Sequence, residues 1–119
     1  MPHEDRDLAL LWDMREAARD ISEFIKDVEY IHFASNKMLR YAVERQILVL
    51  GEAAKRVSDH FKQAHPEIPW SGIIGQRNVL AHEYGEILVE RIWLVAKDRI
   101  PELIALLDPL IPTPSPKVT

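Results

Sequence analysis

The chain has 119 residues, enough for one domain and too few for two of ordinary size. It carries 15 Lys and Arg against 19 Asp and Glu, and the net charge of −4 argues against binding nucleic acid through a general positive surface, leaving room for a local basic cleft. Hydrophobic residues make up 47%, which excludes a disordered chain. The absence of cysteine excludes disulfides, thiolate zinc sites and cysteine nucleophiles.

The sequence shows no signal for a membrane or for export. It contains no run of about 18 apolar residues, so no transmembrane helix is predicted. Its first five residues, MPHED, are acidic and are not followed by the apolar stretch of a signal peptide. We therefore expect a cytoplasmic protein.

Two long helices are predicted in the first half of the chain, where glycine and proline are rare. The first spans about residues 7–33, and its apolar residues recur at helical spacing up to His32. The second spans about residues 37–62 and has a cleaner apolar stripe. Both exceed the usual length of a globular helix, which favours an elongated bundle or a dimer.

Two further helices are predicted after the turn at residues 65–69, HPEIP. The third spans about residues 70–84, with Gly85 as its C-cap, and the fourth about residues 87–107, with a kink or break at Pro101. The fourth is apolar on more than one face, which indicates either burial between two layers or a dimer face, and for an amphipathic chain of this size the pattern favours the dimer. We expect an all-α, up-and-down four-helix bundle over residues 1–111, and an extended, mobile, proline-rich tail over residues 112–119.

The third predicted helix carries the most informative polar cluster. Asn78 and His82 lie one turn apart on one face, and Arg77 and Tyr84 belong to the neighbouring stripe. Arg77 suits a phosphate, His82 can exchange protons near neutral pH, and Asn78 can orient the imidazole or a substrate oxygen. Glu52 on the second helix is a candidate for orienting Arg77. A solvated surface is the common alternative for such a set.

These groups suit metal-independent cleavage of RNA. A base would remove the proton of the 2′-hydroxyl, positive charge would stabilise the pentavalent phosphorus, and an acid would protonate the leaving 5′-oxygen. One histidine cannot easily serve both ends of an in-line displacement, whereas two histidines related by dimer symmetry can. A dimer would therefore also be useful for function.

Other candidate sites are weaker. The residues from His82 to Glu86 begin like the zinc motif H-E-x-x-H but end in glutamate, so a zinc protease is rejected. Three nearby side chains on the second predicted helix and the following turn are more typical of a surface than of a metal site: Asp59, His60 and His65. We expect His32 to be a core or interface residue and Trp12, Trp70 and Trp93 to be core or interface anchors.

The spacing Arg77-x-x-x-x-His82-x-Tyr84 resembles the R-x-x-x-x-H-x-Y motif of HEPN-domain proteins, in particular their HepT toxin branch. The surrounding residues agree with it: Glu44-Arg45 and the segment 51–56, GEAAKR, on the second helix, and Ile68-Pro69-Trp70 before the third. The resemblance covers roughly residues 7–107. The acidic residue that usually follows the family motif is less clear in the segment 85–87, GEI.

The resemblance implies an all-helical homodimer whose two motifs meet at the subunit interface. It implies a metal-independent, cofactor-free endoribonuclease toxin of a type VII toxin–antitoxin pair, acting on an RNA such as a tRNA or mRNA. Arg77 and His82 would be catalytic and Asn78 supporting. The partner would be an MNT-type nucleotidyltransferase that attaches AMP to Tyr84 and thereby silences the enzyme.

Two other functions use the same residues. In the first, the protein is a non-catalytic partner of a nucleotidyltransferase that holds a nucleotide or substrate through Arg77 and Tyr84, without proton transfer by His82. In the second, it is a structural adaptor on which the polar cluster is only surface.

Overall fold

Helices form every regular element in the computed structural model, which describes residues 3–112. From residue 113 onward the expected tail lies outside the described residues. The helices, in chain order, are α1 (His3–Phe24), α2 (Tyr30–Ser35), α3 (Lys37–Arg56), α4 (Asp59–Ala64), α5 (Trp70–His82), α6 (Gly85–Leu94), the π-helical turn η1 (Val95–Arg99), α7 (Ile100–Leu107) and the 3₁₀ turn η2 (Asp108–Leu110).

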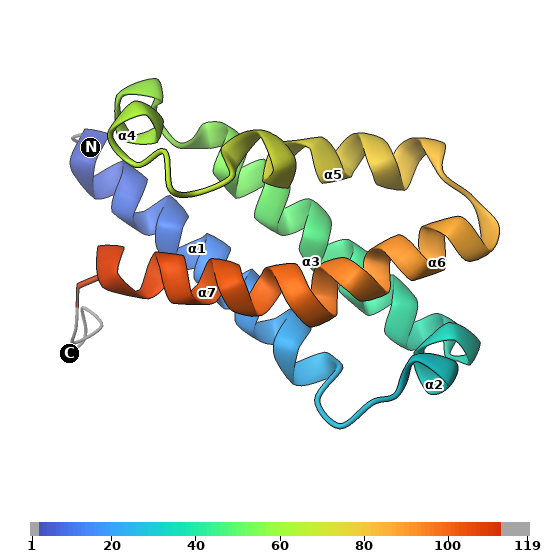
Figure 1. The fold of residues 1–119 in the computed structure, drawn as a ribbon. Coiled ribbons are helices and arrows are strands. Elements are labelled where there is room, and N and C mark those ends of the chain that lie inside the picture. Colours follow the sequence, from blue (N-terminus) through green and yellow to red (C-terminus); the bar gives the residue numbers. More distant parts are fainter. Residues whose placement is uncertain (1–2, 113–119) are drawn as a thin grey trace.

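Four long segments run alternately in opposite directions: α1, α3, α5 and the continuous α6–η1–α7 (Figure 1). This confirms the predicted all-α, up-and-down four-helix bundle. The short helix α2 lies at one end of the bundle, and α4 and the first residues of α1 lie at the other (Figure 1). None of the described helices has the length and apolar character needed to cross a membrane.

Helix α3 is central to the packing, since it contacts α1 on one side and α5 on the other. Its apolar stripe supplies the fully buried Val43 and Ala54. Gly51 lies between them, and a Cβ atom built there would be 3.4 Å from the carbonyl oxygen of Ile73 in α5. The methyl group of alanine would just fit in contact with α5 at this position, whereas a larger side chain would not fit between the two helices.

The first predicted helix is not continuous, which corrects the prediction over residues 7–33. Helix α1 ends at Phe24, and Asp27 adopts φ 60°, a left-handed conformation that ends helices. The chain then resumes as α2, which places Phe33 in the core with its ring 5.1 Å from that of Trp93. The apolar spacing does not predict the break, because residues on both sides of it are buried.

The second predicted helix is also broken, between α3 and α4. Ser58 at the break caps α4 by accepting a hydrogen bond from the Phe61 N–H at 3.1 Å. The Ser58 N–H and hydroxyl both donate to the carboxylate of Asp7 in α1, at 2.9 and 2.6 Å. Asp7 is only 5% exposed. The break therefore satisfies a buried carboxylate 51 residues away in the sequence.

The fourth predicted helix has the expected irregularity. Pro101 lies just after the π-helical turn η1, in which the Ile100 N–H donates to the Val95 carbonyl five residues earlier. Proline cannot donate a backbone hydrogen bond, and its ring clashes with the carbonyl of the preceding turn, so the chain takes up a wider turn before it. The long C-terminal helix is therefore kinked, as predicted.

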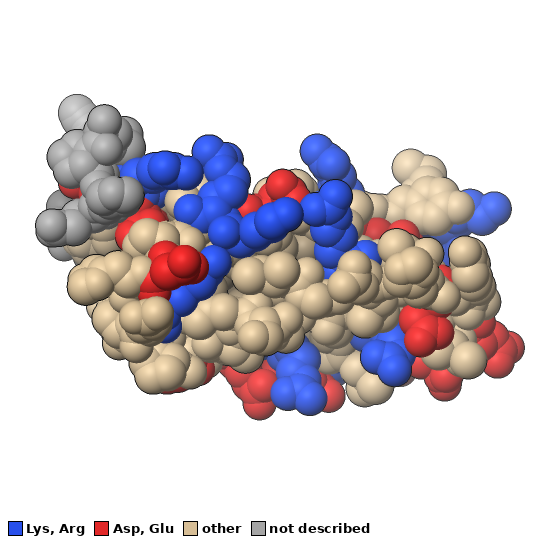
Figure 2. All heavy atoms as spheres, turned by 90° about the horizontal axis from the view of Figure 1, so that it is seen from above, with Lys and Arg blue, Asp and Glu red and all other residues tan. Residues whose placement is uncertain are grey.

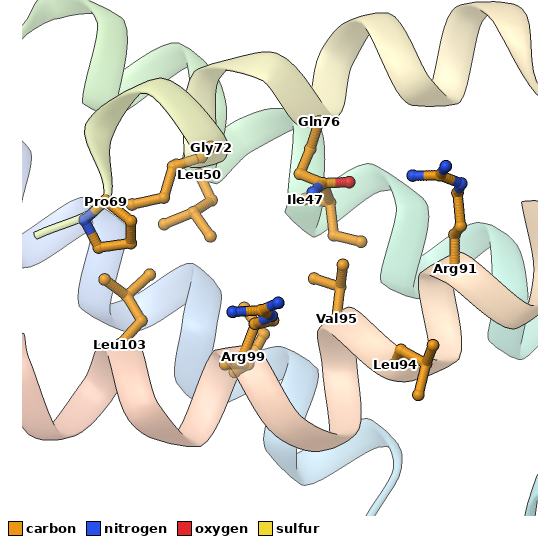
Figure 3. A pocket seen from close by; sticks show the side chains of 12 residues that line it. Ile47, Leu50, Pro69, Gly72, Gln76, Arg91, Leu94, Val95, Arg99 and Leu103 are labelled. Carbon is orange, nitrogen blue, oxygen red and sulfur yellow. The ribbon is translucent and has the colours of Figure 1, made fainter.

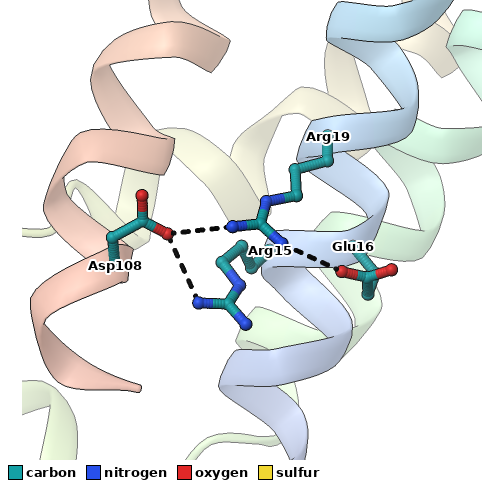
Figure 4. A network of polar contacts seen from close by, with 4 residues as sticks. All are labelled: Arg15, Glu16, Arg19 and Asp108. Carbon is teal, nitrogen blue, oxygen red and sulfur yellow. Dashed lines mark hydrogen bonds and ion pairs between the residues drawn. The ribbon is translucent and has the colours of Figure 1, made fainter. Parts of the chain in front are cut away.

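An ion-pair network fastens the end of the described chain to α1 (Figure 4). The carboxylate of Asp108 lies 3.4 Å from Arg15 and 3.6 Å from Arg19, and Arg19 also lies 3.6 Å from Glu16. The Arg15 side chain is 11% exposed, and its Nε has no hydrogen-bond partner among the described residues. Arg15 therefore depends on Asp108 for compensation of its charge.

Glu44 is a half-buried carboxyl group on α3. Burial raises its pKa above the usual range for glutamate, and the charge of Arg40, one turn earlier, offsets part of that increase. Folding therefore disfavours the charged form of Glu44.

The Asp7 contact gives a prediction for stability. Replacing Asp7 with alanine leaves the Ser58 N–H and hydroxyl without their partner in a partly buried place, and we expect a loss of about 1–3 kcal/mol. Urea unfolding followed by circular dichroism measures it. Asp5→Ala, at an exposed position of the same helix, is the matched control and should change stability far less. Equal stability of the two variants would contradict this role for Asp7.

The shifted pKa of Glu44 gives a pH-dependent prediction. Because the folded state holds this proton more tightly, ionisation of Glu44 lowers stability as pH rises through its folded pKa. Glu44→Gln should therefore stabilise the protein at pH 7, by less than about 1 kcal/mol since the group keeps contact with water. Below the ordinary pKa of glutamate this advantage should disappear. Urea unfolding at both pH values measures it, and a destabilised variant at pH 7 would contradict the prediction.

Candidate active site on helix α5

The polar cluster lies on the last two turns of α5 and the linker that follows. Helix α5 ends at His82, two residues before the predicted end. Its C-cap residue is Glu83, whose N–H donates to the Val79 carbonyl at 2.9 Å. Tyr84 has an extended backbone, with φ −138° and ψ 162°. The prediction that it continues the helical stripe of Arg77 is therefore wrong. Gly85 has φ 64° and opens α6, rather than acting as the C-cap of the preceding helix.

Tyr84 projects into solvent from this linker. Its side chain is 78% exposed, which is unusual for an aromatic residue in a helical protein. Its phenol is therefore accessible to another molecule.

Arg77 faces α3 and contacts Glu52 there. The Nη1 of Arg77 donates to the Glu52 carboxylate at 3.1 Å, and the two side chains are 61% and 56% exposed. The structure thus brings together the two residues for which a contact was considered from the sequence. An exposed pair of this kind contributes about 0–1 kcal/mol, so a ligand phosphate can replace the carboxylate at little cost.

Asn78 and His82 occupy a different face of α5. They lie one turn apart and are both exposed. His82 is five residues after Arg77, which places the two side chains about 140° apart around the helix axis. Within one chain, therefore, the guanidinium and the imidazole point in different directions.

Basic side chains gather on the surface beside this cluster despite the acidic composition. Exposed basic side chains on α3 near Glu52 are Arg45, Lys55 and Arg56. On the face of the bundle that includes α5, Lys and Arg side chains gather along one side, next to a broad uncharged strip (Figure 2). This is the kind of local basic surface that the net charge alone leaves possible.

The other polar candidates do not form a second site. The His65 Nδ1 lies 3.0 Å from the carboxylate of Glu67, and Asp59 and His60 are exposed. Within residues 3–112, no three His, Asp or Glu side chains gather in a way that could hold a metal ion.

Histidine and tryptophan residues outside the polar cluster have mixed roles. His32 is exposed in the single chain, so the prediction of a core position is wrong, and an interface position stays a prediction. Trp70 is buried and Trp93 partly buried against the core, as predicted for anchors, whereas Trp12 is 36% exposed.

One contact near the cluster was not foreseen from the sequence. Glu83 lies 3.9 Å from Arg91, and so ties the end of α5 to α6 across the linker that holds Tyr84. The two residues are eight positions apart, on helices that the sequence pattern does not orient relative to one another. No local spacing rule identifies such a pair.

Comparison with known proteins identifies relatives over most of the chain. A family model described as "Ribonuclease HepT-like" matches residues 14–110, which include the whole polar cluster and Glu52. The protein of Methanocaldococcus jannaschii named "Putative RNase MJ1380" is 39% identical over 95 residues, covering 80% of this chain and 87% of that protein. "Probable ribonuclease HepT" of Thermococcus cleftensis is 37% identical over 93 residues, covering 78% of this chain and 84% of that protein.

A third relative is similar over a longer stretch. The Methanocaldococcus jannaschii protein named "Putative RNase MJ0127" is 33% identical over 111 residues, covering 93% of this chain and 91% of that protein. No solved structure matches the chain with significance.

Proposed function

The chain belongs to the HepT-like ribonuclease family, and we propose that it is a metal-independent endoribonuclease toxin. The observation that carries the proposal is that helix α5 exposes Arg77 on one face and Asn78 and His82 together on another. These three groups supply a fixed positive charge, an amide and a group that exchanges protons near neutral pH. Membership of the family implies that the substrate is RNA.

The proposed reaction is cleavage of the RNA backbone by its own 2′-hydroxyl. A neutral His82 removes the hydroxyl proton, the 2′-oxygen bonds to the adjacent phosphorus, and the bond from phosphorus to the 5′-oxygen breaks. A protonated His82 gives its proton to the leaving 5′-oxygen. Arg77 binds the non-bridging oxygens, whose charge increases in the pentavalent state.

A homodimer fits this division of labour. Because Arg77 and His82 point about 140° apart on one helix, groups from two chains can surround one phosphate more readily than groups from one chain. Two symmetry-related His82 side chains would supply the base and the acid. The catalytic unit is therefore proposed to be a homodimer with a composite site.

Exposed apolar side chains support such an interface. Tyr41 on α3 and Ile31 on α2 are 57% and 69% exposed, and Ile87 on α6 is 58% exposed. The elements that carry them, α2 and the starts of α3 and α6, lie at the end of the bundle where α5 passes into α6 (Figure 1). Large apolar side chains exposed together on a monomer mark interaction surfaces.

Glu52 is proposed as a positioning residue. Its contact holds the Arg77 guanidinium on the α3 side while no RNA is bound. When RNA binds, its phosphate would replace the Glu52 carboxylate as the partner of Arg77, so the guanidinium would be paired with an anion in both states.

The exposed Tyr84 suits regulation by a partner enzyme. We propose an MNT-type nucleotidyltransferase antitoxin as that partner. In the transfer, the phenol oxygen of Tyr84 bonds to the α-phosphorus of ATP, the phenol proton is lost, and the bond to the β-phosphate breaks to release pyrophosphate. The phosphate added to Tyr84 would form an ion pair with Arg77 and so compete with the RNA backbone for this guanidinium.

Loss of His82 tests the catalytic proposal. His82→Ala should lower cleavage of cellular RNA in the presence of EDTA by about 10²–10⁴-fold, because it removes the group that moves protons. His60→Ala, an exposed histidine on α4, is the matched control and should cleave normally. Circular dichroism and gel filtration should show the same fold and oligomeric state for both variants.

The same assay separates the proposal from its rival. If the protein is instead a non-catalytic nucleotide-binding partner, the wild type will not cleave RNA, and His82→Ala will keep its affinity for the ligand held by Arg77 and Tyr84. An unmodified wild-type protein that cleaves no more RNA than His82→Ala would contradict the catalytic role.

Modification of Tyr84 is tested by intact mass. Co-expression with the nucleotidyltransferase should raise the mass of the chain by whole AMP units located at Tyr84. Tyr84→Phe should keep its unmodified mass and escape neutralisation, whereas Tyr41→Phe, at another exposed tyrosine, should behave as the wild type. A neutralised complex with an unmodified Tyr84 would instead indicate inhibition by steric contact.

A further inference from the structure

A groove of about 400 Å³ lies between α5 and the α6–η1–α7 segment (Figure 3). Ile47 and Leu50 of α3 form its floor, and Leu103 of α7 faces it from the opposite wall. On the α5 wall, Gly72 has no side chain, and a Cβ atom there would meet nothing within 4 Å. The groove is thus mainly apolar and has open space along one wall.

The π-helical turn decides which charges face this groove. In a regular α-helix, Asp98 would lie within about 20° of the direction of Arg91, and Arg99 would lie about 80° away. The extra residue of the π turn rotates the following segment back by about 100°, which brings Arg99 to within about 20° of Arg91. The lining residues agree, since Arg91, Val95, Arg99 and Leu103 face the groove and Asp98 does not.

Both arginines are available to a ligand. Arg99 forms no ion pair with another described residue, and Arg91 has only the contact of 3.9 Å with Glu83, in which its side chain remains 54% exposed. Two guanidinium groups in line beside an apolar floor favour an occupant that carries both carboxylates and apolar side chains.

We propose that this groove docks an acidic amphipathic helix of a partner protein. Arg91 and Arg99 are separated by about 12 Å along the helix axis, close to the roughly 10.5 Å between carboxylates seven residues apart on a docked helix. Apolar side chains on the same face of that helix would fill the groove between the arginines, as in other helix-in-groove complexes. Gly72 leaves room for the backbone of the docked helix to approach α5.

The docking groove is separate from the polar cluster. Gln76 lines the groove, whereas the next residue, Arg77, points toward Glu52 on the other flank of α5. A helix in the groove would therefore leave the Arg77–Glu52 contact uncovered. The inference does not depend on the proposed catalysis.

The test is a titration with a designed probe. The probe is a peptide of about 14 residues, or four helical turns, with leucines on one face and two glutamates seven residues apart beside them. A sister peptide carries lysine at both glutamate positions. By fluorescence anisotropy, the acidic peptide should bind with a micromolar Kd and the lysine peptide at least about tenfold more weakly. Amide NMR signals of Gly72 and Gln76 should shift.

Three variants locate the binding. Gly72→Leu fills the groove from a helical position where the side chain meets open space, so the fold should persist. This variant should weaken binding of the acidic peptide at least about tenfold. The double variant Arg91→Glu with Arg99→Glu, made separately, should have the same effect. Lys97→Glu, on the same segment but outside the groove, is the matched control and should change Kd by less than about twofold.

Several results would overturn the inference. Equal affinity for both peptides, no binding of the acidic peptide, or insensitivity to the groove variants would each do so. Displacement of the peptide by ATP or a short RNA, with shifts at the same amides, would assign the groove to nucleotides. A change of oligomeric state in the arginine double variant would instead identify the groove as an interface between copies of this chain. Peptide binding is measured without RNA, so its failure is distinct from a failure of RNA cleavage.

Discussion

Helix α3 approaches α5 at Gly51, where an added Cβ atom would lie 3.4 Å from the carbonyl oxygen of Ile73 and so would just be in van der Waals contact with α5. This approach determines what the next residue can reach. Glu52 is brought to the side of α5, where its carboxylate accepts a hydrogen bond from Arg77 at 3.1 Å. A methyl group would fit at position 51, whereas a side chain that extends beyond Cβ would push the helices apart and withdraw that carboxylate. The packing distance between α3 and α5 therefore also determines where Glu52 holds the exposed Arg77.

Helix α5 separates two surfaces of different chemistry. One flank holds Arg77 beside α3, and the other flank borders the apolar groove with Gln76. The two residues are adjacent in the sequence and face opposite neighbours, because successive side chains on a helix differ by about 100°. A short helix can in this way carry the proposed RNA site on one side and border the proposed docking groove on the other.

The candidate site was partly accessible to sequence reasoning. The pattern indicated that Asn78 and His82 share a face, since their spacing of four residues is one turn and both lie inside α5. It failed for Tyr84, because a helical stripe was extended past the point where the helix ends. The chain leaves α5 at Glu83 and uses the left-handed Gly85 to enter α6, which projects Tyr84 into solvent.

The helical class, the four-part organisation and the kink near Pro101 could be predicted from local patterns, because apolar periodicity and the chemistry of proline act over a few residues. The breaks in the two long helices and the charges that face the groove, by contrast, could be known from the folded chain alone. Ser58 interrupts its helix to satisfy Asp7, 51 residues away. The π turn moves Arg99 into line with Arg91 in place of Asp98. Both depend on contacts or rotations that no local pattern records, because they follow from how distant segments pack together.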